Sequence, residues 1–121
     1  MKTLNKIDNV IEALCRHEDP KSIEVLQEIG TNSEIDEIRE KTSQALIRKN
    51  TPESLYVVIS SAGKGINDLS ARVAMSSINE ILSLSDKTEV IKVLEDTMNS
   101  DFQQEIKDTA RSVKALITYT I

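Results

Sequence analysis

An eleven-residue pattern recurs along the chain, and it restricts the possible folds more than any other feature of the sequence. Residues 13–23 read Ala-Leu-Cys-Arg-His-Glu-Asp-Pro-Lys-Ser-Ile, and residues 45–55, 32 positions later, read Ala-Leu-Ile-Arg-Lys-Asn-Thr-Pro-Glu-Ser-Leu. A weaker copy runs over residues 81–91, a further 36 positions on, and a fourth begins at Ala115. Self-similarity at such a period is typical of proteins in which like units stack. The sequence therefore predicts a repeat protein.

Each unit is predicted to contain two helices. After each copy of the pattern, apolar residues recur three or four positions apart, first over a short segment and then, beyond a turn, over a longer one. The start of the chain carries only the longer type. We therefore expect a single all-α domain of about seven helices, with a half repeat at 1–18 and helix pairs at 19–50, 51–85 and 86–121.

Short polar residues mark where several of these helices begin. Asp19 and Thr51 are predicted N-caps, because their side chains can accept hydrogen bonds from the free amides of a first helical turn. Pro20 and Pro52 follow them at the first helical position, where the missing amide costs nothing. The longest break between predicted helices is the stretch at 62–65, which we interpret as a turn.

Composition and charge limit the partners. The chain has 20 acidic and 15 basic side chains, for a net charge of −5, which argues against nucleic acid and anionic membranes. Its N-terminal residues lack the pattern of a secretory signal, and no window is apolar enough to span a membrane, so we expect a cytoplasmic protein.

Few residues are suited to catalysis or metal binding. Cys15 is the one cysteine and His17 the one histidine, so an internal disulfide and a three- or four-ligand Cys/His zinc site are excluded. The two residues are also two positions apart, which places them on different faces of a helix. We expect no enzyme, and we nominate no catalytic, cofactor-binding or metal-ligating residue.

The chain resembles a known family over essentially its whole length. The resemblance rests on Ile38-Arg39, Thr42, Ala45-Leu46, Thr51-Pro52-Glu53-Ser54-Leu55 and Val58. This run resembles a HEAT repeat, especially the short variety found in phycobilisome lyases. The resemblance implies a right-handed α/α superhelix, a solenoid whose second helices line a concave wall. It also implies a loop aspartate that supports the repeat arginine, and Asp19 is the residue that matches this aspartate.

A polar stripe along the second helices is the candidate binding site. Arg72, Ser76, Asn79 and Ser83 share one helix face, and a displacement of 35 residues leads from them to a second set on the last helix. We expect these two sets to form parallel ridges, extended by residues of the preceding pair, that bind an acidic segment of a partner protein. An ordinary solvated helix face is the alternative. The predicted partner-binding residues are Arg39, Ser43, Arg72, Ser76, Asn79, Lys107, Arg111 and Lys114.

The function we expect is that of a protein–protein interaction module, a small adaptor or regulatory subunit without a cofactor. The resemblance to phycobilisome lyases implies an alternative, an accessory subunit of a tetrapyrrole (bilin) lyase-like enzyme, which the scarcity of aromatic residues disfavours. Binding of nucleic acid is a third and less favoured option. The apolar end of the chain at 117–121 either folds back, giving a monomer, or forms a weak homodimer.

Overall fold

The computed structural model describes residues 2–60 and 65–120, and these residues form helices and no strand. Seven α-helices and one 3₁₀ turn occur in this part of the chain, so the predicted all-α class and number of helices are confirmed. The elements are α1 (Lys2–Arg16), α2 (Lys21–Asn32), α3 (Asp36–Lys49), α4 (Pro52–Ser60), η1 (Gly65–Asn67), α5 (Ala71–Leu82), α6 (Thr88–Met98) and α7 (Gln104–Thr120).

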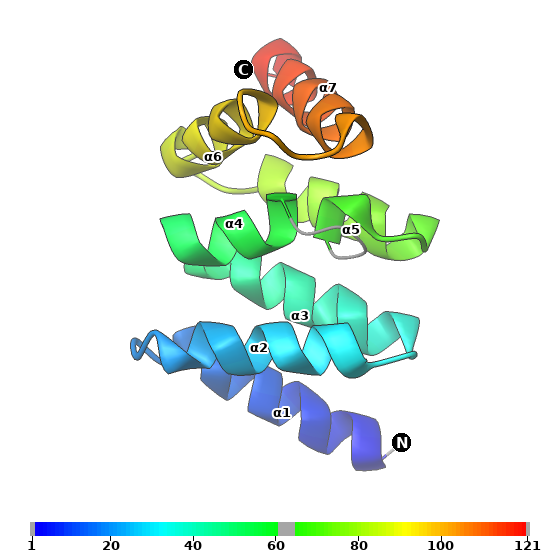
Figure 1. Cartoon of the computed structure of the whole chain (residues 1–121). Helices are drawn as coiled ribbons and strands as arrows, with labels where there is room; N and C mark the ends of the chain where they lie inside the picture. Colours follow the sequence, from blue (N-terminus) through cyan, green and yellow to red (C-terminus); the bar gives the residue numbers. More distant parts are fainter. Residues whose placement is uncertain (1, 61–64, 121) are drawn as a thin grey trace.

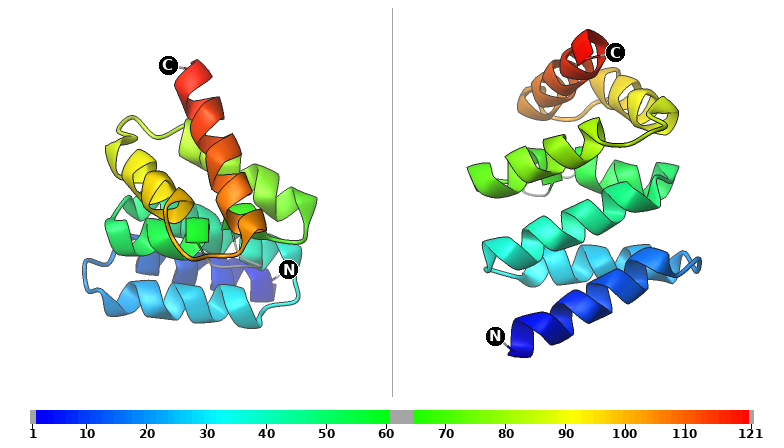
Figure 2. Two further views of the ribbon diagram at one scale, coloured as in Figure 1. Left: turned by 45° about the horizontal axis from the view of Figure 1, so that its top comes forward. Right: turned by 180° about the vertical axis from the view of Figure 1, so that it is seen from behind.

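The helices are arranged in two rows (Figure 1). Helices α1, α3 and α5 pack side by side in one row, and α2, α4 and α6 follow one another in the second row. Helix α7 departs from this order, because it packs on α6 and reaches α4 and η1 without lying along α5 (Figure 2). None of the described helices combines the length and the apolar character needed to cross a bilayer.

The core lies between the two rows. Helix α4 is enclosed on several sides, and its consecutive residues Val57, Val58 and Ile59 are all buried. Burial of each such aliphatic side chain contributes about 1.5–3 kcal/mol before the loss of conformational entropy is subtracted. The largest fully buried side chains of the core are Leu26, Ile47, Leu55, Ile59, Ile81, Leu94 and Ile117.

The predicted start of the second helix pair is confirmed, whereas α2 begins at Lys21, one residue later than predicted, with Pro20 at the N-cap position. The carboxylate of Asp19 accepts a hydrogen bond from the amide of Lys21 at 2.9 Å. The hydroxyl of Thr51 accepts one from the amide of Ser54 at 3.2 Å, and α4 begins at Pro52 as the sequence predicts. The local signals in the sequence thus place the starts of these helices to within one residue.

Among the described residues, two adopt the left-handed conformation. Asn50, with φ of 53°, ends α3, and its side-chain amide donates a hydrogen bond to the carbonyl oxygen of Asp86 at 3.0 Å. Gly65, with φ of 51°, begins η1, and a Cβ atom there would lie 2.4 Å from Cγ1 of Val58. Only glycine fits this site without strain. Except for Gly65, the predicted turn at 62–65 lies outside the described residues.

The recurring pattern is structurally equivalent only in the middle of the chain. Its first residues, Ala13, Ala45, Ile81 and Ala115, lie in α1, α3, α5 and α7 respectively. Ala45 and Ile81 are buried, whereas Ala13 and Ala115 are exposed. The first and last copies of the pattern therefore begin at exposed positions, whereas the two central copies begin at buried ones.

Candidate interaction face on the odd-numbered helices

Polar side chains join α3 to α5 in three surface rungs. The two members of each rung lie 32 positions apart, and successive rungs lie four positions apart, so that all of them occupy one face of the adjacent helices. We call these six residues the α3–α5 ladder. Its rungs are Glu40 with Arg72 at 3.2 Å, Gln44 with Ser76 at 2.6 Å, and Arg48 with Glu80 at 3.3 Å.

The same face continues onto α1 through ion pairs. Lys41 of α3 donates a hydrogen bond to Asp8 of α1 and also pairs with Glu37 at 3.2 Å. The hydrogen bond with Asp8 raises the pKa of Lys41 above its usual value. Arg48, already in the ladder, has Glu12 of α1 at 3.9 Å on its other side. The three odd-numbered helices therefore share one surface of alternating charge.

In two rungs of the ladder the positive groups are the more exposed partners. The side chains of Arg72 and Arg48 are 56% and 50% exposed, whereas those of Glu40 and Glu80 are each 18% exposed. The hydrogen bond with Glu40 raises the pKa of Arg72. The guanidinium groups thus lie nearer the surface than the carboxylates, and their N–H donors are accessible to solvent.

Ser43 does not belong to this surface. Its side chain is buried beneath the ladder, where its oxygen lies 2.6 Å from that of Ser77 in α5. Because the hydroxyl of Ser77 donates to the carbonyl of Val73 at 2.8 Å, Ser43 is the donor in the bond between the two serines. The prediction that Ser43 extends an exposed stripe is wrong, since a hydroxyl can be buried when a second hydroxyl satisfies it.

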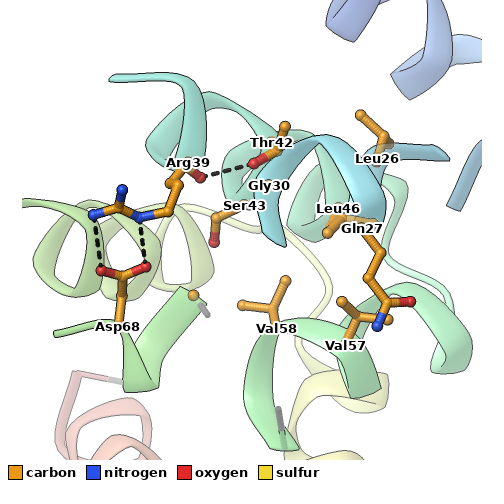
Figure 3. A pocket seen from close by; sticks show the side chains of 11 residues that line it. Leu26, Gln27, Gly30, Arg39, Thr42, Ser43, Leu46, Val57, Val58 and Asp68 are labelled. Carbon is orange, nitrogen blue, oxygen red and sulfur yellow. Dashed lines mark hydrogen bonds and ion pairs between the residues drawn. The ribbon is translucent and has the colours of Figure 1, made fainter. Parts of the chain in front are cut away.

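Hydrogen bonds and ion pairs hold the side chain of Arg39, which is only partly exposed (Figure 3). Its side chain is 19% exposed, its Nε donates to Asp68 at 3.1 Å, and its Nη atoms donate to the carbonyl of Ser33 and to Asp36. The hydrogen bond with Asp68 raises the pKa of Arg39. The predicted place of Arg39 on the exposed stripe is therefore wrong. The aspartate that pairs with Arg39 is Asp68, which the sequence analysis did not single out.

A small cavity lies beside the pair of Arg39 and Asp68, between α2, α3, α4 and η1 (Figure 3). Its volume is about 20 Å³, enough for a single water molecule. The hydroxyl-bearing residues Thr42 and Ser43 and the apolar Val58 line it. A void of this size is a packing feature and not a ligand site.

The basic residues of α7 are not continuous with the ladder. Arg111 pairs with Asp108 on its own helix at 2.9 Å, and Lys114 reaches Glu95 of α6 at 3.3 Å. Lys107, one turn before Arg111, is half-buried. Because α7 does not lie along α5 in the described structure, the predicted pair of parallel ridges is wrong.

The error has a simple geometric cause. Val73 and Ser77 are buried in α5, and the buried residues at the matching places of α7 are Ile106 and Ala110, 33 positions later. The predicted displacement of 35 is therefore two residues too long. Each residue turns an α-helix by about 100°, so two residues move the predicted stripe to a different face of α7.

Part of the predicted stripe remains. Arg72 and Ser76 belong to the ladder, and Asn79 is exposed on the same helix. The sequence analysis missed their partners on α3, although opposite charges 32 positions apart, the same displacement as in the recurring pattern, were visible. The missed residues are Glu40, Gln44, Arg48 and Glu80.

Comparisons with known proteins found no relative of this chain. No family model, curated protein or solved structure matches the chain.

Proposed function

We propose that this chain is a protein-binding module, a small adaptor or regulatory subunit, built as a short HEAT-like solenoid. The α3–α5 ladder is the observation that carries the proposal. It is a surface of regularly spaced donors and acceptors on helices that pack side by side. Buried contacts hold both helices in place, so the ladder is preorganised for a partner.

The spacing of the ladder suits an extended segment. Arg72 of α5 and Arg48 of α3 lie two rungs apart, which is about 12 Å along the helix axis at 1.5 Å per residue. Because the axes of packed helices also lie about 8–10 Å apart, the two positions are separated by about 15 Å on the diagonal. Four or five residues of an extended chain span about 13–17 Å. We therefore infer an extended partner segment with acidic residues four or five positions apart. Its carboxylates would accept from the two exposed guanidinium groups, and Gln44 with Ser76 would lie between them.

Charge reversal on the ladder tests this proposal. The double variant Arg48→Glu and Arg72→Glu should lose at least about tenfold in affinity for the partner segment, which corresponds to about 1.4 kcal/mol. Affinity purification from the source cell, followed by cross-linking, identifies that segment. Fluorescence anisotropy with the corresponding peptide then measures its affinity. A peptide with its acidic residues moved to adjacent positions should bind more weakly.

A matched control distinguishes the ladder from general charge effects. Lys21→Glu and Lys92→Glu change the net charge equally, but on exposed positions of α2 and α6 in the other row. The lysine control should keep wild-type melting, because surface substitutions away from specific contacts usually change stability by less than about 0.5 kcal/mol each. The ladder variant should lose some stability, because its new carboxylates lie beside Glu40 and Glu80, so binding is compared at a temperature at which circular dichroism shows both variants folded. Equal binding by the two variants would place the partner site elsewhere.

A further inference from the structure

The side of α5 that faces away from α3 is partly uncovered, at Ala71 and Met75. On α3, Asp36, Glu40 and Ser43 form the hydrogen bonds that reach the segment of α5. Buried residues of α3 and α5 correspond at a displacement of 35, as Ile38 does to Val73. Adding 35 to the numbers of the three α3 residues that bond toward α5 gives 71, 75 and 78. These positions of α5 therefore point to where a further helix of the same row would pack. A regular stack would cover these positions with the next odd-numbered helix.

This side of α5 is apolar. Met75 is 55% exposed and Ala71 is exposed, while Ile78 and Leu82 are only partly buried. Their spacing places all four on one side of the helix. Helix α7 packs on α6, α4 and η1, and Ile78 and Leu82 pack against the core, whereas Ala71 and Met75 stay exposed.

Helix α7 carries a second exposed apolar surface. One side of it is buried and includes Val113 and Ile117. The other side, near its end, includes Ala115, which is exposed, and Tyr119, which is 88% exposed. The described residues thus include one exposed apolar patch at Ala71 and Met75 of α5 and a second one at Ala115 and Tyr119 near the end of α7.

We propose that two copies of the chain form a twofold dimer in which α7 of each copy lies on the α5 face of the other. Such a contact is isologous, so one arrangement covers both apolar surfaces of both copies. The net charge of −5 opposes self-association at most surfaces. Ala71, Met75, Ile78 and Leu82 carry no charge, however, and Arg72 and Glu80 of α5 pair with α3. This face is therefore suited to a second copy, and the ladder stays accessible.

Sedimentation equilibrium over a wide range of protein concentration tests the dimer. The mass should rise from 13.5 kDa toward twice that value with increasing concentration. Met75→Glu should abolish this rise and leave helicity unchanged, with melting like that of the wild type at concentrations at which both are monomeric. Val10→Glu provides the matched control, because Val10 is 50% exposed on α1, at the opposite end of the molecule. A wild-type protein that stays monomeric, or an equal effect of both substitutions, would overturn the proposal.

Disulfide trapping tests the arrangement of the dimer. In a Cys15→Ser background, Met75→Cys and Tyr119→Cys proteins are mixed and treated with a mild thiol oxidant. A covalent dimer of one copy of each is expected, because the two positions face each other between copies. Failure of the mixture to form it, while a dimer is present, would overturn this geometry. A double variant that links only within one chain would show instead that α7 closes onto its own α5.

Discussion

Ser43 donates a hydrogen bond to Ser77 across the contact between α3 and α5, with 2.6 Å between their oxygens and both side chains buried. The bond lies beneath the exposed ladder and links the same two helices. A buried hydroxyl must find a partner, so this pair favours one register of α3 against α5 over its alternatives. The surface rungs depend on that register.

The two serines should respond unequally to truncation. Ser77→Ala leaves the hydroxyl of Ser43 buried without its acceptor and should cost about 1–3 kcal/mol of unfolding free energy. Ser43→Ala should cost about 1 kcal/mol or less, because Ser77 keeps its bond to the carbonyl of Val73. Urea unfolding measures both values. A larger cost for Ser43→Ala would contradict the assigned direction of the bond.

Replacement of Arg39 should destabilise the fold more than replacement of Arg72. The carboxylate of Asp68 is 3% exposed, and Arg39→Met would leave it buried without its cation, at a cost of about 3–5 kcal/mol. Arg72→Met breaks an exposed rung and should cost less than about 1 kcal/mol. Thermal and urea unfolding compare the two. Similar losses would mean that the pair of Arg39 and Asp68 contributes no more to stability than an exposed rung of the ladder.

Gly65→Ala should lower stability by about 2–4 kcal/mol. The left-handed backbone disfavours any side chain there, and the new Cβ would lie 2.6 Å from the carbonyl oxygen of Val58. Combining it with Val58→Ala removes the side-chain clash and keeps the backbone one, so it should not restore stability. Urea unfolding of the single and double variants checks this. Full recovery in the double variant would show that the backbone contact is unimportant.

Stability should fall in acid partly through Asp36. The hydrogen bond from Ser70 and the contacts with Arg39 hold the pKa of Asp36 below its usual value. The unfolded chain therefore binds a proton here more readily, and this contribution is complete above the unfolded pKa of about 3.9. It is lost as the pH falls below that value through the lower pKa of the folded state.

Asp36→Asn isolates this effect. The variant should be less stable than the wild type at neutral pH, and its stability should fall less steeply in acid. Urea midpoints measured from neutral pH into the acid range give both slopes. Parallel curves for the two proteins would exclude Asp36 as a source of the pH dependence. The wild type should retain some acid sensitivity from Asp86, whose pKa is lowered by hydrogen bonds from Thr88.

Local features of the sequence were sufficient to predict the helices. Apolar spacing and the capping residues Asp19 and Thr51 act within one or two turns, so their effects can be predicted without knowing the fold. The position of α7 could not be predicted this way. Its buried residues, such as Ile106 and Val113, have helical spacing whether the helix lies along α5 or over α4, and only contacts between distant elements decide between these arrangements.

The candidate face was harder to predict because polarity at one position does not determine exposure. Ser43 and Ser76 are both serines of second helices, but the first is buried by a partner hydroxyl and the second accepts from Gln44 nearer the surface. The sequence likewise did not indicate that Arg39 would form an ion pair with the buried carboxylate of Asp68. Pairs of residues at the repeat displacement, such as Glu40 with Arg72, would have been a better guide.

The rungs between helices also bear on how quickly the protein reaches its native state. Each of them joins residues 32 positions apart, and the bond between Asn50 and Asp86 spans only 36. Helical domains dominated by contacts between neighbouring elements fold in about microseconds to milliseconds, because no loop as long as the whole chain has to close before those contacts form. Rapid folding limits the time during which the long aliphatic segments of α4 are accessible to other unfolded chains.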